Sequence, residues 1–527
     1  MSRVSRMLGF KAPSPNVTRL ASIVLLLGST WSIAFQISTT FWMISIATAL
    51  GGGDYILGMG MVGFLVIVRI AVQTLLDYPT GGIGDWIGQR WILAGALVCY
   101  ALAFWLTSMA TLSTPFIIFV IIYALMGLGA SQESGAMPAW FDNNYRVAMP
   151  QDKDRKQYGV FWSRAGMMFQ LVSTLILIPG SILALIFSEA WVFQVQAIIF
   201  IALAVMTLVF VRDLPGARKK ESEHGGFREY GRLLKDGIKF VGSSRFVTLT
   251  MLGEMLMWAI GIVWWEILLF PLYFGYLLSN VAVATFRTSM FAPMVVSQER
   301  SGVISQRFEP KKWIPRFRLI QFGSMAFFML LMAITAIFPQ PTAAAAFITV
   351  YIPFTAAPFI TLPLASIVPV ILIWVLFVGT DTLGRIAGVL TGRIMVDVYP
   401  NRIRNCMYSL QPTIAMLLSI PFIILLSQLL AFLPFLKFPI VFTIAAGVAF
   451  AGALLIRQGF KHPIPRDESI EEVIGKVSEE EPKVPEVEVP EVPIPAEIPA
   501  QMATELPAEI PSDVTSTPHE EFKEPLK

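Results

Sequence analysis

Acidic and basic side chains recur inside the long apolar segments of this 527-residue chain. Glu133 and Arg164 lie in consecutive segments at a similar expected depth, so they could form an ion pair that is either fixed or broken in one conformational state. Asp381 and Arg385 are four residues apart and would share one face of a helix. They would either neutralise each other or form a proton or solute site in which the cation stabilises the carboxylate.

Four further acids and bases lead to separate interpretations. Glu254 stands one turn before Trp258, and we expect it to be the best candidate for proton coupling, against the alternative of a neutral acid bonded to a hydroxyl or amide. Arg69 and Arg287 would favour an anionic solute, or balance buried acids, if they face a cavity. Arg287 lies nearer a segment end and is the better candidate for reaching the lipid surface. Glu266 is also expected near an end, where interfacial water makes a charge less costly.

Aromatic side chains add a candidate binding surface, although rings in membrane helices more often pack or lie at the lipid interface. The residues that would line such a cavity with Arg69 are Trp31, Phe35, Trp162, Trp258 and Trp374. The three histidines lie outside the apolar segments, and the two cysteines form no recognisable ligand set. No Ser/His or Cys/His constellation falls at membrane depth either. We therefore expect no metal, no cofactor and no enzyme activity.

Membrane-spanning helices must hold these residues in place. Hydrophobic residues make up 55% of the chain and charged residues 14%, with a mean hydropathy of +0.67, which is unlike a soluble protein. A spanning helix needs about 20 mostly apolar residues. The expected helices cover residues 20–48, 55–79, 91–112, 115–140, 159–186, 189–211, 246–274, 279–299, 316–338, 367–397, 407–432 and 438–457. The sequence therefore predicts an all-α membrane protein with twelve transmembrane helices in two six-helix bundles.

Lysine and arginine set the expected orientation, because they stay on the cytoplasmic side of short loops. They gather at the N-terminus and in every second loop, including the central segment 213–245, which places both termini in the cytoplasm. The halves then cover residues 1–212 and 246–461. Residues 462–527 are acidic and rich in proline, and we expect a disordered tail that is a solvated spacer rather than a docking site for a protein.

One apolar stretch, 340–366, is nearly long enough to span the membrane. Counting it as a helix would place Arg402 and Arg404 on the outer side, against the distribution of the other basic residues. We therefore expect an outer insertion that is interfacial or re-entrant.

The loop expected after the second helix combines glycines with an acid and a base: Gly81, Asp85, Gly88 and Arg90. Glycine lets helix ends approach closely, and an acid can face a helix N-terminus. This pattern resembles the loop between helices 2 and 3 of the major facilitator superfamily, although Trp86 stands where that family usually has a base. Residues 134–142 also resemble the end of helix 4 in facilitator members related to drug:proton antiporters. Residues 302–311 repeat the loop in degraded form in the second half.

The resemblance implies two pseudo-symmetric bundles that rock about a central site, with the 81–90 loop acting in the conformational change. It implies a secondary transporter for a small organic solute, with proton coupling, in the cell membrane. The alternatives are a proton-independent facilitator, a lipid flippase, or a non-transporting sensor or scaffold that acts through a tail-binding protein. Partners other than solute, protons and lipid are not implied, and we expect no nucleic acid.

Overall fold

The computed structural model describes most of the chain up to residue 465. The described residues are 8–10, 13–133, 136–152, 156–217, 235–291, 293, 322–341, 346–351, 358–398, 404–433, 436–463 and 465. All of them belong to one compact unit, Met1–Gly475. Most of the predicted central segment and nearly all of the predicted tail lie outside the described residues.

Helix is present in each of the six spans predicted for the first half. The elements are α2 (Pro15–Gln36), α3 (Trp42–Leu50), α4 (Tyr55–Ile87), α5 (Gln89–Ser108), α6 (Phe116–Glu133), α7 (Ala136–Ala148), α8 (Lys156–Leu175), α9 (Leu177–Ile186) and α10 (Glu189–Phe210). The first and fifth predicted helices are thus each divided in two. Ser38 and Thr40 in the first break bond to Gln196 and Ser181, and Pro179 cannot donate to the carbonyl of Leu175 at the second.

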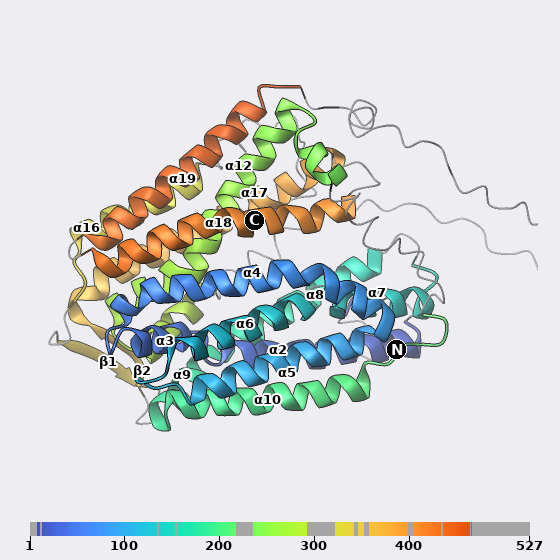
Figure 1. The fold of residues 1–527 in the computed structure, drawn as a ribbon, viewed down its shortest axis with the longest axis horizontal. Coiled ribbons are helices and arrows are strands. Elements are labelled where there is room, and N and C mark those ends of the chain that lie inside the picture. Colours follow the sequence, from blue (N-terminus) through green and yellow to red (C-terminus); the bar gives the residue numbers. More distant parts are fainter. Residues whose placement is uncertain are drawn as a thin grey trace, which may run out of the picture. The chain divides into compact units, whose positions relative to one another are not determined.

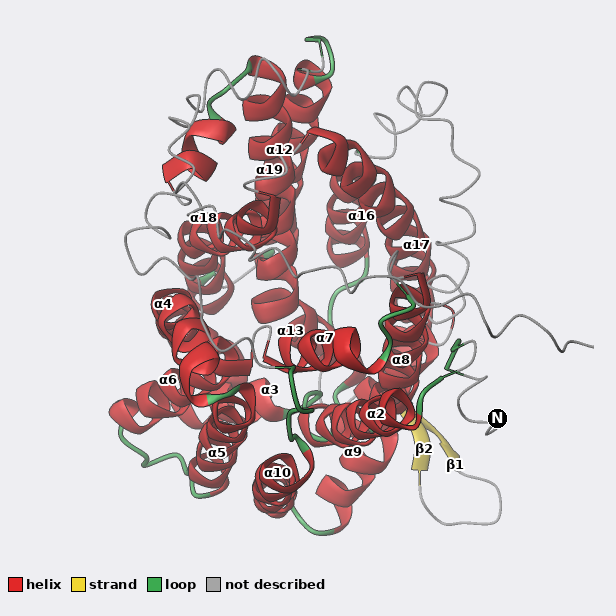
Figure 2. Cartoon of the chain, turned by 90° about the vertical axis from the view of Figure 1, so that its right-hand side faces the viewer, coloured by secondary structure: helices red, strands yellow, loops and turns green. Residues whose placement is uncertain are grey.

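The second half contains helix in the other six predicted spans. The elements are α12 (Arg245–Val263), the π-helix η1 (Trp264–Leu268), α13 (Leu269–Leu277), α16 (Gly323–Ile337), α17 (Ile367–Val398), α18 (Arg404–Phe432) and α19 (Lys437–Gly459), with further helix at 280–291. Within the described residues, ten helices are long and apolar enough to cross a membrane. Of the predicted spans, 115–140, 279–299 and 316–338 are described only in part. Figure 2 shows α4, α5, α6 and α10 in one group and α12, α16, α18 and α19 in another.

One segment differs from the sequence-based expectation, and the predicted insertion contains strands that the sequence did not predict. The loop predicted after residue 79 is helical, because α4 continues to Ile87 and the chain turns only at Gly88, whose φ of 106° suits glycine. Gly81 and Asp85 therefore lie on α4, and Arg90 lies in the first turn of α5 over the ring of Trp91. The insertion at 340–366 contains an antiparallel hairpin of β1 (Phe347–Tyr351) and β2 (Pro358–Pro363). It lies at the end of the bundle opposite the N-terminus (Figure 1).

The two halves contact each other at the end that carries the hairpin. Tyr55 meets Phe274 edge to face at 5.2 Å between ring centroids, and Gln428 of α18 donates a hydrogen bond of 3.1 Å to the carbonyl of Gly60 on α4. Asn280 donates to the Glu189 carboxylate at 2.7 Å. Toward the opposite end, α12 and α19 diverge from α4 (Figure 1). These three contacts join the halves at the predicted outer end.

Replacing Gly58 with alanine should lower the melting temperature of the detergent-solubilised protein, because a Cβ there would collide with the carbonyl of Ala47 in α3. Overpacking of this kind costs about 1–3 kcal/mol. Gly261→Ala is the matched control, since a Cβ there would meet nothing within 4 Å and alanine favours helix. Equal melting temperatures for the two variants would contradict the close approach of α3 and α4.

Candidate functional site

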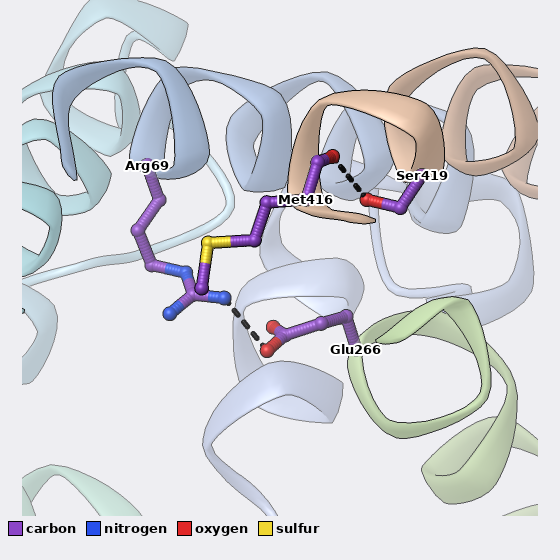
Figure 3. Close-up of polar contacts among 4 residues, drawn as sticks. All are labelled: Arg69, Glu266, Met416 and Ser419. Atoms are coloured by element: carbon purple, nitrogen blue, oxygen red, sulfur yellow. Dashed lines mark hydrogen bonds and ion pairs between the residues drawn. The ribbon is translucent and has the colours of Figure 1, made fainter. Parts of the chain in front are cut away.

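An ion pair joins the two halves at membrane depth. Arg69 Nη2 of α4 lies 2.6 Å from Glu266 Oε1 of η1 (Figure 3). Arg69 is the fifteenth residue of α4, about 20 Å from its first residue, so the pair lies well inside the hydrocarbon. The side chains are 21% and 32% exposed, so the pair is enclosed without being sealed.

The sequence-based expectation for Glu266 was wrong. Its position in the later part of the predicted seventh helix, 246–274, indicated an interfacial acid, but Glu266 lies eleven residues before Leu277, the last residue of the helical run, and contacts Arg69 at membrane depth. The surrounding turn is a π-helix, which holds more residues per turn than an α-helix and is frequent at functional sites. An isolated charge at this depth is costly, and the opposite charge on the other half offsets that cost.

The second half adds α18 beside the ion pair. In Figure 3 the Met416 side chain extends toward the Arg69 guanidinium, and Ser419 Oγ donates a 2.6 Å hydrogen bond to the Met416 carbonyl. Proline at 412 and 421 interrupts the regular bonding of this helix. A thioether can repack readily, so this wall of the site can adapt when the ion pair changes.

A second polar group lies on the first half near Arg69. Tyr100 of α5 donates a 3.0 Å hydrogen bond to Glu133 Oε2 of α6, and Arg69 interacts electrostatically with the phenols of Tyr100 and Tyr123. Glycines on α6 make this packing possible. A Cβ at position 127 would lie 2.5 Å from the Arg69 carbonyl oxygen, and one at 129 would lie 2.7 Å from the Tyr100 ring.

The structure places the predicted acid–base pairs as follows. Glu133 accepts its hydrogen bond from Tyr100, whereas Arg164 has an exposed side chain on α8. A Glu133–Arg164 pair therefore stays a prediction for another conformational state. Asp381 is half-buried on α17 and has an interaction partner, while the side chain of Arg385 lies outside the described residues. Glu254 is half-buried on α12 and also has an interaction partner.

The predicted aromatic residues do not gather in one pocket. The ring centroids of Trp31 and Phe35 are 5.0 Å apart, and Phe35 packs on Tyr100 inside the first half. Trp162 packs on α7, and Trp258 is 48% exposed on α12. Trp374, on α17, donates its indole N–H to Ser289 Oγ at 3.1 Å. Among the predicted cavity residues in the described part of the chain, only Arg69 contacts the Glu266 carboxylate of the other half.

Arg287 also differs from its expected position. Its side chain is 5% exposed and packs against Phe270 and Phe291, so it does not reach the lipid surface. Packing with the neighbouring helices outweighs the short distance to a helix end. In the described ranges, no three His, Cys, Asp or Glu side chains are grouped to hold a metal ion.

Comparisons with known proteins identify the fold. No protein-family model and no curated protein matches the sequence. Among solved structures, the nucleoside transporter NupG aligns with 85% of this chain and 100% of its own, at 13% identity and a TM-score of 0.54. A point mutant of the same transporter aligns with 84% of this chain and 99% of its own, at 12% identity and a TM-score of 0.56.

A bacterial homolog of the human lysosomal transporter Spinster, in an inward-facing and unoccupied conformation, is also similar. It aligns with 87% of this chain and 97% of its own, at 13% identity and a TM-score of 0.53. These likenesses confirm the predicted fold class, which is the two-bundle, all-α fold of major facilitator transporters.

Reversing both charges of the ion pair should restore stability that either reversal removes. Arg69→Glu and Glu266→Arg should each lower the melting temperature by a few degrees, because each places like charges together at membrane depth. The double variant should recover at least half of the loss. The Asp142–Arg146 pair is the control, since both residues lie on α7 of the first half and Arg146 is 60% exposed, so its reversal does not act on the contact between the halves and should have a smaller effect. Additive losses in the double variant would show that the two charges do not interact.

Proposed function

We propose that this protein is a secondary active transporter that moves a small organic solute by alternating access. The observation that carries the proposal is the Arg69–Glu266 ion pair, which connects the two bundles of a facilitator fold at membrane depth. An interaction between bundles that move against each other can form in one access state and break in the next. The similarity to solved transporters supports the same function.

The contacts between the halves support an inward-open state for this conformation. They involve Tyr55 with Phe274, Gly60 with Gln428 and Glu189 with Asn280, all at the predicted outer end. In the outward-open state these contacts would separate, and the Arg69–Glu266 pair would break with them. In both states the predicted basic loops and the two termini would face the cytoplasm. The protein would lie in the cell membrane.

The proposed proton coupling would act through Glu266. Protonation removes the negative charge that attracts Arg69, and a neutral carboxyl group holds the halves together less strongly. Protonation of Glu266 would therefore favour separation of the halves at the outer end, whereas deprotonation would restore the ion pair. Glu254, Glu133 and Asp381 stay alternative proton sites. The residues at 81–90 would act at the opposite end, as the resemblance implies.

The substrate class is open to direct screening. The resemblance of residues 134–142 to members related to drug:proton antiporters supports amphipathic organic solutes, and the likeness to NupG supports nucleosides as the first compounds to test. A proton-independent facilitator or a lipid flippase would use the same fold without a response to pH. A sensor or scaffold would act through a protein bound to the tail instead, and would carry no flux.

Glu266→Gln should abolish pH-driven solute accumulation in proteoliposomes that contain a trapped pH dye, while solute counterflow at equal pH is retained. The amide imitates the protonated acid, so the exchange step survives but no proton is carried. Glu254→Gln and Glu133→Gln are the comparison variants. Unchanged pH-driven accumulation in Glu266→Gln would refute its coupling role, and a loss confined to Glu254→Gln would assign that role to Glu254. A complete absence of wild-type flux would refute transport itself.

A further inference from the structure

Arg287 is enclosed between helices of the second half. It lies on the helix at 280–291 with 5% of its surface exposed. Its Cζ atom is 4.8 Å from the ring centroid of Phe270 on α13 and 5.1 Å from that of Phe291. Tyr273, also on α13, interacts with it electrostatically. The guanidinium group is therefore surrounded mainly by aromatic surface.

Two of the three guanidinium nitrogens of Arg287 lack a hydrogen-bond acceptor among the described residues. Its Nε and Nη1 atoms are buried and have no acceptor in the described part of the chain. Phenylalanine rings attract the positive charge through their faces, but they supply no oxygen acceptor for donors in the guanidinium plane. Arginine does not lose its proton in proteins, so neutralisation by deprotonation is not open to it. A buried cation whose N–H groups lack acceptors raises the free energy of the folded protein, and an anion with acceptor oxygens would offset that cost by binding it.

The helix that carries Arg287 also contacts the other half. Thr288, the next residue, donates a 3.3 Å hydrogen bond to the carbonyl of Thr174 on α8. Asn280, at the start of the same helix, bonds to Glu189. On its other side, Ser289 accepts a hydrogen bond from Trp374 of α17. Arg287 therefore lies beside a surface that must separate when the halves move in alternating access.

We propose that Arg287 binds the anionic group of the transported solute, a carboxylate or a phosphate. The guanidinium fork matches both groups, and its unpaired N–H groups are the donors that such an anion requires. Phe270 and Phe291 would hold an apolar or aromatic part of the same molecule. This inference names the substrate class of the proposed transporter and so rests on that function.

Binding by the detergent-solubilised full chain tests the inference without a transport assay. The probes are phenyl phosphate, benzoate and the uncharged benzyl alcohol, and the readout is the dissociation constant from the concentration dependence of thermal stabilisation. We expect at least one anion to stabilise the wild type and benzyl alcohol not to do so. Arg287→Gln should bind that anion at least tenfold more weakly, since a charge-assisted hydrogen bond is lost. The preferred anion distinguishes phosphate from carboxylate recognition.

Arg287→Lys is the second variant, for use if Arg287→Gln does not fold. It keeps the positive charge but loses the forked guanidinium, and should bind the anion severalfold more weakly than the wild type. Arg457→Gln on α19 is the control, because that arginine is exposed in the last turn of its helix. Unchanged affinity in both Arg287 variants, or no stabilisation of the wild type by either anion, would overturn the inference. Anion binding without flux of any solute would leave the site in place and refute the proposed transport.

Discussion

A charge at the depth of the hydrocarbon needs an opposite charge or a hydrogen-bond partner, and Arg69 finds its opposite charge on the other half of the chain. The first half carries the base and the second half carries the acid, so their separation leaves two charges that must be satisfied in another way. Water, a proton or a charged solute can each do this. The partial exposure of both side chains admits those exchanges.

Hydropathy, together with the distribution of basic residues, was enough to predict the spans in which the structure describes helix, since length and lack of charge are imposed by the bilayer itself. The interruptions within the spans were not predicted. The break after α2 depends on Ser38 and Thr40 bonding to residues of α9 and α10, which are distant in sequence. The continuation of α4 past its glycines and the strands at 347–363 were also missed. In each case a tertiary contact or local backbone bonding outweighed the apolar pattern.

The candidate site was predictable only in its parts. Arg69 was recognised as a charge inside a span, but its partner is 197 positions away (266 − 69), and one sequence contains no signal for that contact. Glu266 was assigned to an interface from its distance to the predicted helix end alone, although the observed run ends only three residues after the predicted one, at Leu277. Arg287 was misplaced for a related reason, since distance to a helix end says nothing about the rings of Phe270 and Phe291 that enclose it.

The π-turn at Trp264–Leu268 has a consequence for how one span serves both bundles. A turn with an extra residue puts the two parts of the helix out of phase, so a stripe of side chains that faces one neighbour before the turn is rotated away after it. Before the turn, α12 packs on α18 and α19 of its own half, while η1 packs on α4 and α13 on α3 of the other half. The phase change lets a single membrane span belong to the body of one bundle and to the contact surface of its partner.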